Sequence, residues 1–323
     1  MTTCCSIVVQ MASMLRAKRL NVGRLRLGST CALLLVTVPM LSMPGNAEVS
    51  HPCGNGVELR FSSSKFSQGD LVPVEVHSPS PLAELKAEWV GHTLPFWQDN
   101  SHENARRALL GVDLERPAGQ YQLTLTAQLE SGERVTCSAL VSVKARRFAI
   151  ERLRVGRRFV ELGPKDLERA EREDHRLREL FARVTPNRLW QGRFRLPVDG
   201  TKAEGNFGRR RILNGQRRSP HSGEDFPAPA GALVHGAQRG RVVLAESLFF
   251  SGNTVVLDHG LGLYTLYGHL ELIAVGVGDL VEAGTPLGRA GATGRVTSPH
   301  LHWAVRLNEA RVDPLQLVAV SSD

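Results

Sequence analysis

The stretch from His221 to Trp303 limits most strongly how this chain can fold, because residues of related chemistry stand at its two ends. It opens with the run His221-Ser222-Gly223-Glu224-Asp225, closes with Pro299-His300-Leu301-His302-Trp303, and contains Tyr267-Gly268-His269-Leu270 between them. Histidine nitrogens and carboxylate oxygens are ligands that zinc prefers in proteins. This combination in this order predicts that the fold gathers these side chains around a metal ion.

The closing pair of histidines predicts a local geometry. Successive side chains of a β-strand point to opposite faces, so His300 and His302 share one face while Leu301 is buried behind them. Two imidazoles on one face suit one metal ligand and one catalytic neighbour. We therefore expect both rings to converge on the site.

These motifs, HxGxD, YGH and HLHW among glycine turns, closely resemble those of the lysostaphin-like (LytM-type) zinc endopeptidases that cut peptidoglycan cross-links. The resemblance covers about Phe194 to Leu317. Carried over position by position, it implies that Zn²⁺ is bound by His221, Asp225 and His302, and that the catalytic histidines are His269 and His300.

Further matches and two departures accompany the motifs. The run Asn206-Phe207-Gly208 matches upstream, and His259, in Asp258-His259-Gly260, fits a structural turn position. Glu224 stands where an apolar residue is commoner, and Ser298 replaces a frequent glycine. Glu224 is expected to point away from the metal because positions 221, 223 and 225 have the opposite parity.

The resemblance implies a zinc-dependent endopeptidase that hydrolyses peptide cross-links or stems of bacterial peptidoglycan through a zinc-activated water. No HExxH motif is present, so the general base and the oxyanion stabiliser are expected to be His269 and His300. Two alternatives stay open. One is a non-enzymatic LytM-domain regulator of cell-wall hydrolases, and the other is an intact enzyme held inactive by its own N-terminal domain or connector.

Residues 1–47 have the order of a secretory signal peptide: a basic region, an apolar run over 31–38, and small residues before a predicted cleavage point after Ala47. An uncleaved anchor is the alternative, although the run is short for a membrane span. Translation from Met11 or Met14 also stays open. We expect an exported protein of the periplasm or cell envelope, or a secreted one, with no stable membrane span after cleavage.

The net charge says little about partners once the leader is removed. The leader holds five basic residues and no acid, so its loss lowers the formal charge from +8 to +3. A mildly basic protein is compatible with an anionic wall polymer. No nucleic-acid motif is present, and we expect a peptidoglycan peptide as substrate. A regulatory protein partner and the oligomeric state stay open.

Two cysteines, Cys53 and Cys137, remain after the leader, and an exported pair favours a disulfide over two buried thiols. They fall in the first predicted domain, residues 48–147, where short period-2 runs separated by turn signals predict an antiparallel β-sandwich. Its segment Gly119-Gln120-Tyr121-Gln122-Leu123 resembles the tyrosine corner of immunoglobulin-like domains. Trp89 and Trp97 are either core residues or a carbohydrate-stacking surface.

A helical connector is predicted over 148–193. From Lys165 to Val184 apolar residues recur at helical spacing and form a narrow stripe that is expected to dock on a neighbouring domain; the stripe consists of Leu167, Ala170, Leu177, Phe181 and Val184. A coiled-coil dimer is the weaker alternative because fewer than three clean heptads are present.

Residues 194–318 are predicted to form the C-terminal antiparallel β domain, a LytM-type peptidase domain of duplicated-hybrid-motif-like fold by resemblance, and 319–323 a tail. Strands are expected at 240–244, 254–257, 263–267 and 302–307. The run from Val277 to Gly284 looks like the hairpin of a biotin or lipoyl carrier. That interpretation fails, because the only lysine of this domain is Lys202, upstream of every strand. The fold class is therefore mainly β, with one helical connector.

Overall fold

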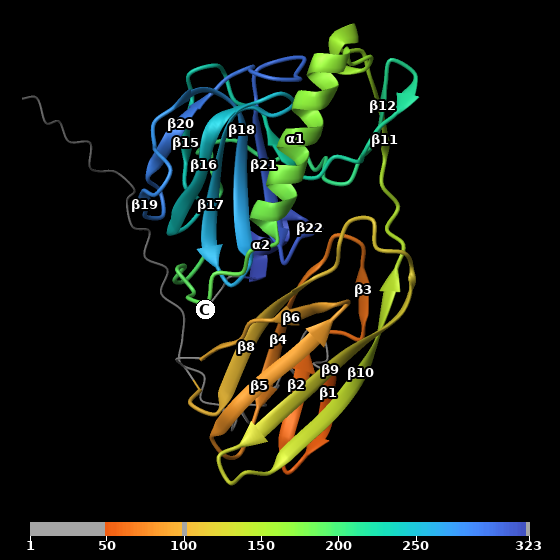
Figure 1. Cartoon of the computed structure of the whole chain (residues 1–323), viewed down its shortest axis with the longest axis vertical. Helices are drawn as coiled ribbons and strands as arrows, with labels where there is room; N and C mark the ends of the chain where they lie inside the picture. The colour runs from red at the N-terminus through yellow and green to blue at the C-terminus, as the bar shows by residue number, and fades with distance from the viewer. Residues whose placement is uncertain (1–48, 99–101, 321–323) are drawn as a thin grey trace, which may run out of the picture. The chain divides into compact units, whose positions relative to one another are not determined.

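The computed structural model describes residues 49–98 and 102–320, and these confirm a mainly β fold (Figure 1). The predicted leader and the last residues of the predicted tail lie outside the described residues. Among the described residues, no helix is long and apolar enough to cross a membrane.

The first part of the described chain is a sandwich of two five-stranded sheets. One sheet has the order β1 (Val49–Gly54), β2 (Val57–Phe61), β4 (Leu71–His77), β8 (Ala105–Gly111) and β7 (Trp97–Gln98). The other has the order β3 (Lys65–Ser67), β10 (Arg134–Lys144), β9 (Gly119–Leu129), β5 (Leu82–Trp89) and β6 (His92–Leu94). Alternating apolar side chains from both sheets fill one core, as the period-2 runs predict. Its immunoglobulin-like class stays a prediction.

The disulfide predicted between Cys53 and Cys137 is present. Cys53 lies on the edge strand β1 of one sheet and Cys137 on β10 of the other, so the bond links the two layers. On β9 the hydroxyl of Tyr121 donates a hydrogen bond to the Pro117 carbonyl at 2.8 Å. A bond from this tyrosine back to the upstream backbone is the feature that defines a tyrosine corner.

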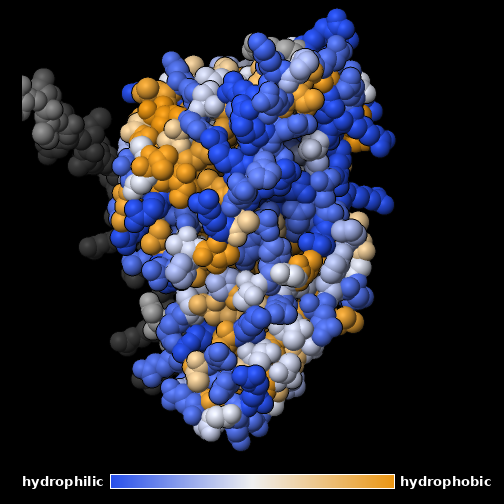
Figure 2. All heavy atoms as spheres, in the orientation of Figure 1, coloured by the Kyte–Doolittle hydropathy of each residue, from blue (hydrophilic) through white to orange (hydrophobic). Residues whose placement is uncertain are grey.

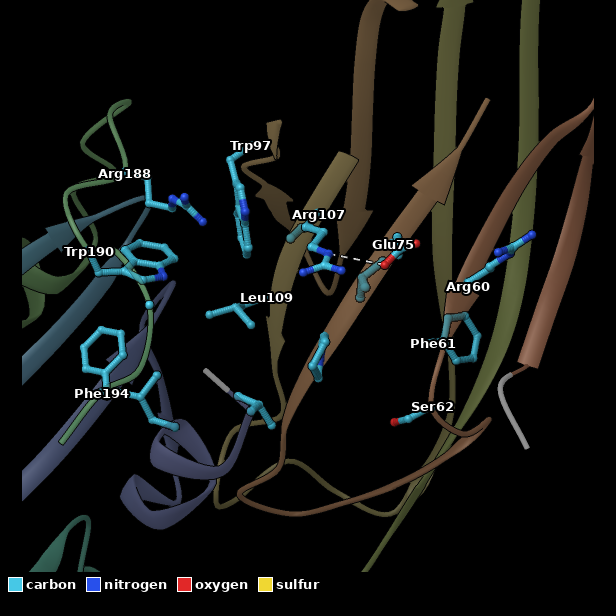
Figure 3. Close-up of a pocket in the computed structure, with 16 residues that line it drawn as sticks. Arg60, Phe61, Ser62, Glu75, Trp97, Arg107, Leu109, Arg188, Trp190 and Phe194 are labelled. Atoms are coloured by element: carbon cyan, nitrogen blue, oxygen red, sulfur yellow. Dashed lines mark hydrogen bonds and ion pairs between the residues drawn. The ribbon is translucent and has the colours of Figure 1, made fainter. Parts of the chain in front are cut away.

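The two tryptophans of the sandwich have different surroundings. Trp89 is buried in the core and its indole N–H donates to the Gly111 carbonyl, which favours the core interpretation. Trp97 packs edge-on against Trp190 at 5.5 Å between ring centroids, and the Arg188 guanidinium lies 5.2 Å from one ring centre and 5.6 Å from the other (Figure 3). These residues line a pocket of about 330 Å³.

The connector contains more than a helix. A short strand β11 (Ile150–Leu153) pairs in parallel with β12 (Arg210–Leu213), which pairs in turn with β13 (Gln216–Arg217). A single 3₁₀ turn, η1 (Arg157–Phe159), precedes the helix α1 (Pro164–Phe181). The sequence predicted the helix but not the strand.

Helix α1 docks on the large C-terminal sheet, as predicted. Phe181, with Leu177 and Leu180, packs against a cluster on the outer face of that sheet that includes Tyr264 and Leu266. The opposite surface of the helix is hydrophilic (Figure 2). The prediction was wrong at the ends of the stripe, since Leu167 and Val184 are exposed; Leu167 lies in the first turn and Val184 beyond the C-terminus of the helix.

The C-terminal part is one nine-stranded sheet, and its core also includes Leu71 of β4 from the sandwich. Its main path runs β14 (Glu224–Phe226), β21 (Leu301–Leu307), β18 (Leu263–Ile273), β17 (Gly252–Gly260), β16 (Gly240–Leu248) and β19 (Leu280–Val281). Off this path lie β15 (Leu233–His235), β20 (Pro286–Ala290) and β22 (Ala310–Val312). The four predicted strands are all present, and every pairing in this sheet is antiparallel.

A short helix that the sequence did not predict, α2 (Pro314–Val320), follows β22 and contacts β4. Beside it, Arg311 makes a two-pronged ion pair with Asp113, with nitrogen–oxygen distances of 2.9 and 2.7 Å. The guanidinium of Arg311 holds the pKa of Asp113 below its usual range, although burial alone would raise it. These contacts join the sandwich to the C-terminal sheet.

Loss of the Cys53–Cys137 bond should destabilise the sandwich. The two cysteines are 84 residues apart, and a cross-link closing a loop of that size stabilises a fold by about 4–5 kcal/mol in the chain-entropy model. We expect a double Cys53→Ser, Cys137→Ser variant to unfold at lower urea concentration than the oxidised protein. Reductant should lower the midpoint of the parent and leave that of the variant unchanged; equal midpoints for parent and variant would contradict the prediction.

Candidate metal and catalytic site

The pairing of three strands assembles the site. In the sheet, Asp225 on β14 pairs with His302 on β21, and His302 pairs on its other side with Gly268 on β18. His269 follows Gly268 directly, so this predicted catalytic histidine lies at the same end of the sheet as the predicted ligands Asp225 and His302. His221 lies four residues before Asp225, in the segment that leads into β14.

The three residues predicted as metal ligands converge on one point. His221 Nε2 lies 2.9 Å from His302 Nδ1, which lies 2.9 Å from Asp225 Oδ1. The distance from His221 Nε2 to Asp225 Oδ1 is 3.2 Å. Three donor atoms from distant parts of the sequence thus form a small triangle.

This triangle fits a metal ion. Bonds of about 2.0–2.2 Å from zinc to nitrogen and oxygen, in tetrahedral arrangement, place neighbouring donor atoms about 3.3–3.6 Å apart. The observed separations are slightly smaller, so a bound ion would need only small outward movements of the side chains. Two imidazole nitrogens and one carboxylate oxygen are also the donor types that such an ion takes. The trio therefore forms a candidate metal site.

Asn206 holds two of these side chains in place. Its carbonyl lies 3.1 Å from His221 Nδ1 and accepts a hydrogen bond from the N–H there. The neutral His221 ring then has its lone pair on Nε2, which faces the site. Its side-chain amide donates to Asp225 Oδ2 at 2.9 Å and accepts from the Asp225 backbone N–H at 3.0 Å. Asn206 is itself 1% exposed. Outer partners of this kind fix ligand orientation.

The glycine of the first motif makes room for the second ligand. A Cβ atom placed on Gly223 would lie 2.6 Å from the Trp303 carbonyl oxygen and 2.7 Å from the His302 ring. Any side chain at this position would push His302 away from Asp225. A glycine at position 223 therefore leaves the space that the His302 imidazole occupies next to His221 and Asp225.

The other two histidines lie against the predicted ligands. The ring centroid of His269 is 4.8 Å from that of His300 and 5.8 Å from that of His302. His269 Nδ1 donates to the Thr293 carbonyl at 2.9 Å, and His300 Nδ1 donates to the Ser298 carbonyl at 2.8 Å. Because a carbonyl oxygen only accepts, Nδ1 of each ring carries a proton, and the neutral form of each ring has its lone pair on Nε2.

Burial sets the protonation of this cluster. It lowers the pKa of His302 to about 4 and that of His269 to about 3, so both rings are neutral near pH 7. Burial alone would raise the pKa of Asp225, but the hydrogen bond with His302 and the close approach of His221 hold it well below its usual range. Neutral imidazoles and an ionised carboxylate are the forms that bind a metal ion.

The remaining residues singled out in the sequence lie outside the trio. Glu224 is buried and accepts hydrogen bonds from the backbone N–H groups of Asn206 and Phe207, at 2.9 and 3.1 Å; its pKa is raised, chiefly by burial. His259 is fully buried between the Arg239 carbonyl and the Thr265 hydroxyl, which supports a structural role.

Sequence reasoning missed the outer contacts of the site. The Asn206-Phe207-Gly208 match was visible, but not that Asn206 holds two ligand side chains. It also missed Arg211, whose Nη2 lies 3.6 Å from Asp225 Oδ2. Runs of arginine around position 210 were the only signal for this second contact.

Comparisons with known proteins agree with this arrangement. Residues 219–314 match the model of peptidase family M23, a range that includes all five histidine and aspartate residues of the site. Two curated proteins of Vibrio cholerae serotype O1 are similar: peptidoglycan DD-endopeptidase ShyB, 40% identical over 97 residues, and peptidoglycan DD-endopeptidase ShyA, 41% identical over 111 residues. These matches cover 30% and 34% of this chain but only 23% and 26% of the relatives.

The chain spans about a quarter of the length of those relatives. A longer match is to a crystal structure assigned to peptidase M23 from Pseudomonas aeruginosa, with 30% identity and a TM-score of 0.61. It covers 78% of this chain and 94% of the other. With nearly the whole of that relative matched, and the family model spanning the complete site, this chain belongs to peptidase family M23.

Proposed function

We propose that this protein is an exported zinc-dependent endopeptidase that hydrolyses peptide cross-links or stems of peptidoglycan. One observation carries the proposal: the candidate metal-ligand trio and two histidines whose Nδ1–H groups are fixed to backbone carbonyls occupy one end of the sheet. The names of the relatives, both peptidoglycan DD-endopeptidases, support the substrate class. The disulfide supports export, since such bonds persist in oxidising compartments.

His221, Asp225 and His302 would hold the zinc ion through the three atoms that face one another. An ion with three protein ligands and an open position supplies Lewis-acid polarisation of a carbonyl and lowers the pKa of water. Asn206 would keep His221 and Asp225 aligned for it by the hydrogen bonds described above.

His269 and His300 would handle protons and negative charge. Each Nδ1–H is fixed to a backbone carbonyl, so the ring is held in one orientation with Nε2 as a proton acceptor. The carbonyl also stabilises the ring once it becomes charged. One histidine would take a proton from the attacking water at Nε2 and pass it to the departing amine, and the other would stabilise the oxyanion.

The two histidines differ in access. The His300 side chain is 17% exposed and lies at the end of a loop, whereas His269 is buried more deeply. We assign the exchange of protons with substrate to His300 on this ground.

Purified sacculi test the proposal directly. The protein without residues 1–47 should release peptide fragments from sacculi, and a chelator should abolish the release until zinc is restored. Mass spectrometry of the soluble products identifies the bond that is cut. Metal content near zero that added zinc does not restore, together with intact sacculi, would contradict the enzyme and favour the regulator.

Replacing the histidines one at a time separates ligand from catalyst. His302→Ala removes one of three protein ligands, so zinc content and cleavage should fall together. His300→Ala and His269→Ala leave the trio whole and should keep zinc while losing a factor of about 10²–10⁴ in rate. Zinc content and cleavage rate are measured on the same preparations.

Exposed His175, on α1 and away from the site, offers the matched control: His175→Ala should keep both zinc and rate. If His300→Ala loses its zinc while His302→Ala retains it, the two roles are reversed. If both variants cleave like the parent, the active site lies elsewhere.

A further inference from the structure

A set of arginines lies beside the proposed active site and takes no part in the mechanism above. Arg211 and Arg217 come from the hairpin β12–β13, Arg218 follows it, and Arg295 comes from the loop that precedes His300. We call Arg211, Arg217, Arg218 and Arg295 the arginine cluster. Its members come from two segments about 80 positions apart in the sequence, and the fold brings Arg295 within electrostatic reach of Arg211 and Arg218.

Arg295 is the member most closely tied to the site. The segment from Thr293 to Ser298 carries it, and the first and last residues of this segment supply the carbonyls that hold His269 and His300. Its guanidinium stacks on Phe250, 4.3 Å from the ring centre, and its backbone N–H donates to the Phe250 carbonyl. The side chain is therefore held over the loop next to His269.

Arg295 has no acidic partner among residues 49–98 and 102–320. Its charged neighbours are Arg211 and Arg218, and burial together with these like charges lowers its pKa to about 10. A half-buried cation facing two others is unfavourable in the free protein, because the charges repel and water is partly excluded. An anion placed among them would relieve this repulsion.

The other members are only partly neutralised. Arg211 contacts Glu151 at 3.2 Å and Asp225 at 3.6 Å. Arg218 donates to the carbonyl of Val160 and to the side chain of Gln216, both at 2.6 Å, and neither acceptor is charged. The cluster therefore retains positive charge toward the site even after its acidic neighbours are counted.

A groove beside the cluster gives a ligand room to approach. It has a volume of about 780 Å³, and its walls include Arg211, Arg217 and Arg218. Its walls also include Ser219 and Pro220, which directly precede the predicted metal ligand His221 in the sequence. A groove of this size accommodates several residues of a peptide.

We propose that the arginine cluster is a substrate subsite that binds a free carboxylate of the cross-linking peptide, next to the bond that is cut. Guanidinium groups bind carboxylates through paired, charge-assisted hydrogen bonds, which suits the unpartnered Arg295 and the half-partnered Arg218. The inference rests on the proposed function and adds a preference to it. The enzyme prefers a cross-link in which the peptide that supplies the amine carries a free carboxylate beside that amine.

The chemistry of cross-links offers a matched pair of substrates. The amine of a cross-link comes either from diaminopimelate, which carries a carboxylate on the same carbon, or from the side chain of lysine, which lacks it. The two acceptors otherwise occupy the same volume near the scissile amide. A subsite for that carboxylate must therefore distinguish them.

The experiment compares two synthetic cross-linked peptides that differ only in this carboxylate. The zinc-loaded protein should cleave the diaminopimelate peptide with a kcat/KM about tenfold or more above that of the lysine peptide, mainly through KM. Arg295→Gln and Arg218→Gln should bring the ratio close to one, and Arg295→Lys should retain part of it. Arg241 is an exposed arginine at the start of β16. Arg241→Gln should leave the ratio of the two kcat/KM values unchanged.

Binding measurements separate this inference from the proposed function. His300→Ala, with zinc bound, should bind the diaminopimelate peptide about tenfold more tightly than the lysine peptide at low salt, and the difference should shrink as salt is added. Equal affinities, or a preference that Arg295→Gln and Arg218→Gln both retain, would overturn the subsite. If neither peptide is cleaved by the parent but the binding preference is present, the proposed function fails while the carboxylate subsite stands.

Discussion

The pairing of β21 with β14 on one side and β18 on the other is the constraint on which the site depends. It places His302 between Asp225 and Gly268. Leu301 and Trp303, on either side of His302, are fully buried in the core. A slip of one residue would turn these two outward and His302 inward, at the cost of the burial of a large aromatic side chain. The hydrophobic core thus fixes which face of the strand carries the imidazole.

Backbone groups then fix how each ring is turned. The carbonyls of Asn206, Thr293 and Ser298 each accept a hydrogen bond from the Nδ1–H of one histidine. His269 is held in a left-handed backbone conformation, with φ of 64°, which a residue with a side chain adopts only when its surroundings require it. Its N–H bonds to the Ser251 carbonyl at 2.7 Å in that conformation. This backbone strain is confined to His269, where the imidazole ring must point away from the regular side-chain direction of β18.

The sequence was informative wherever a short-range pattern determined the geometry. The parity of His300 and His302 predicted one shared face, and alternating runs predicted the main strands. The short strand β11 was not visible, because Ile150–Leu153 is exposed or half-buried and flanked by arginines, and its partner β12 lies about 60 residues away. Helix α2 was missed because its seven residues, Pro314–Val320, are too few for a helical period to stand out.

The role of Asn206 depends on contacts with residues 15 to 19 positions away, which no local pattern records. The same holds for the arginine cluster, whose meaning appears only when the loop of Arg295 meets the hairpin of Arg218. The resemblance predicted which residues are the ligands, and the fold shows which contacts hold those residues in place.

The connector contributes to the site through this missed strand. Glu151, on β11, pairs with Arg209 and with Arg211 at 3.2 Å each, and Arg211 in turn reaches Asp225. One carboxylate of the connector thereby positions Arg211, the member of the arginine cluster that contacts the predicted metal ligand Asp225. Because β11 is held to β12 by parallel pairing over four residues, a shift of the connector would move Arg211 away from Asp225. The segment that joins the sandwich to the peptidase sheet, through Ile150 of β11, is therefore part of the wall of the groove beside the arginine cluster.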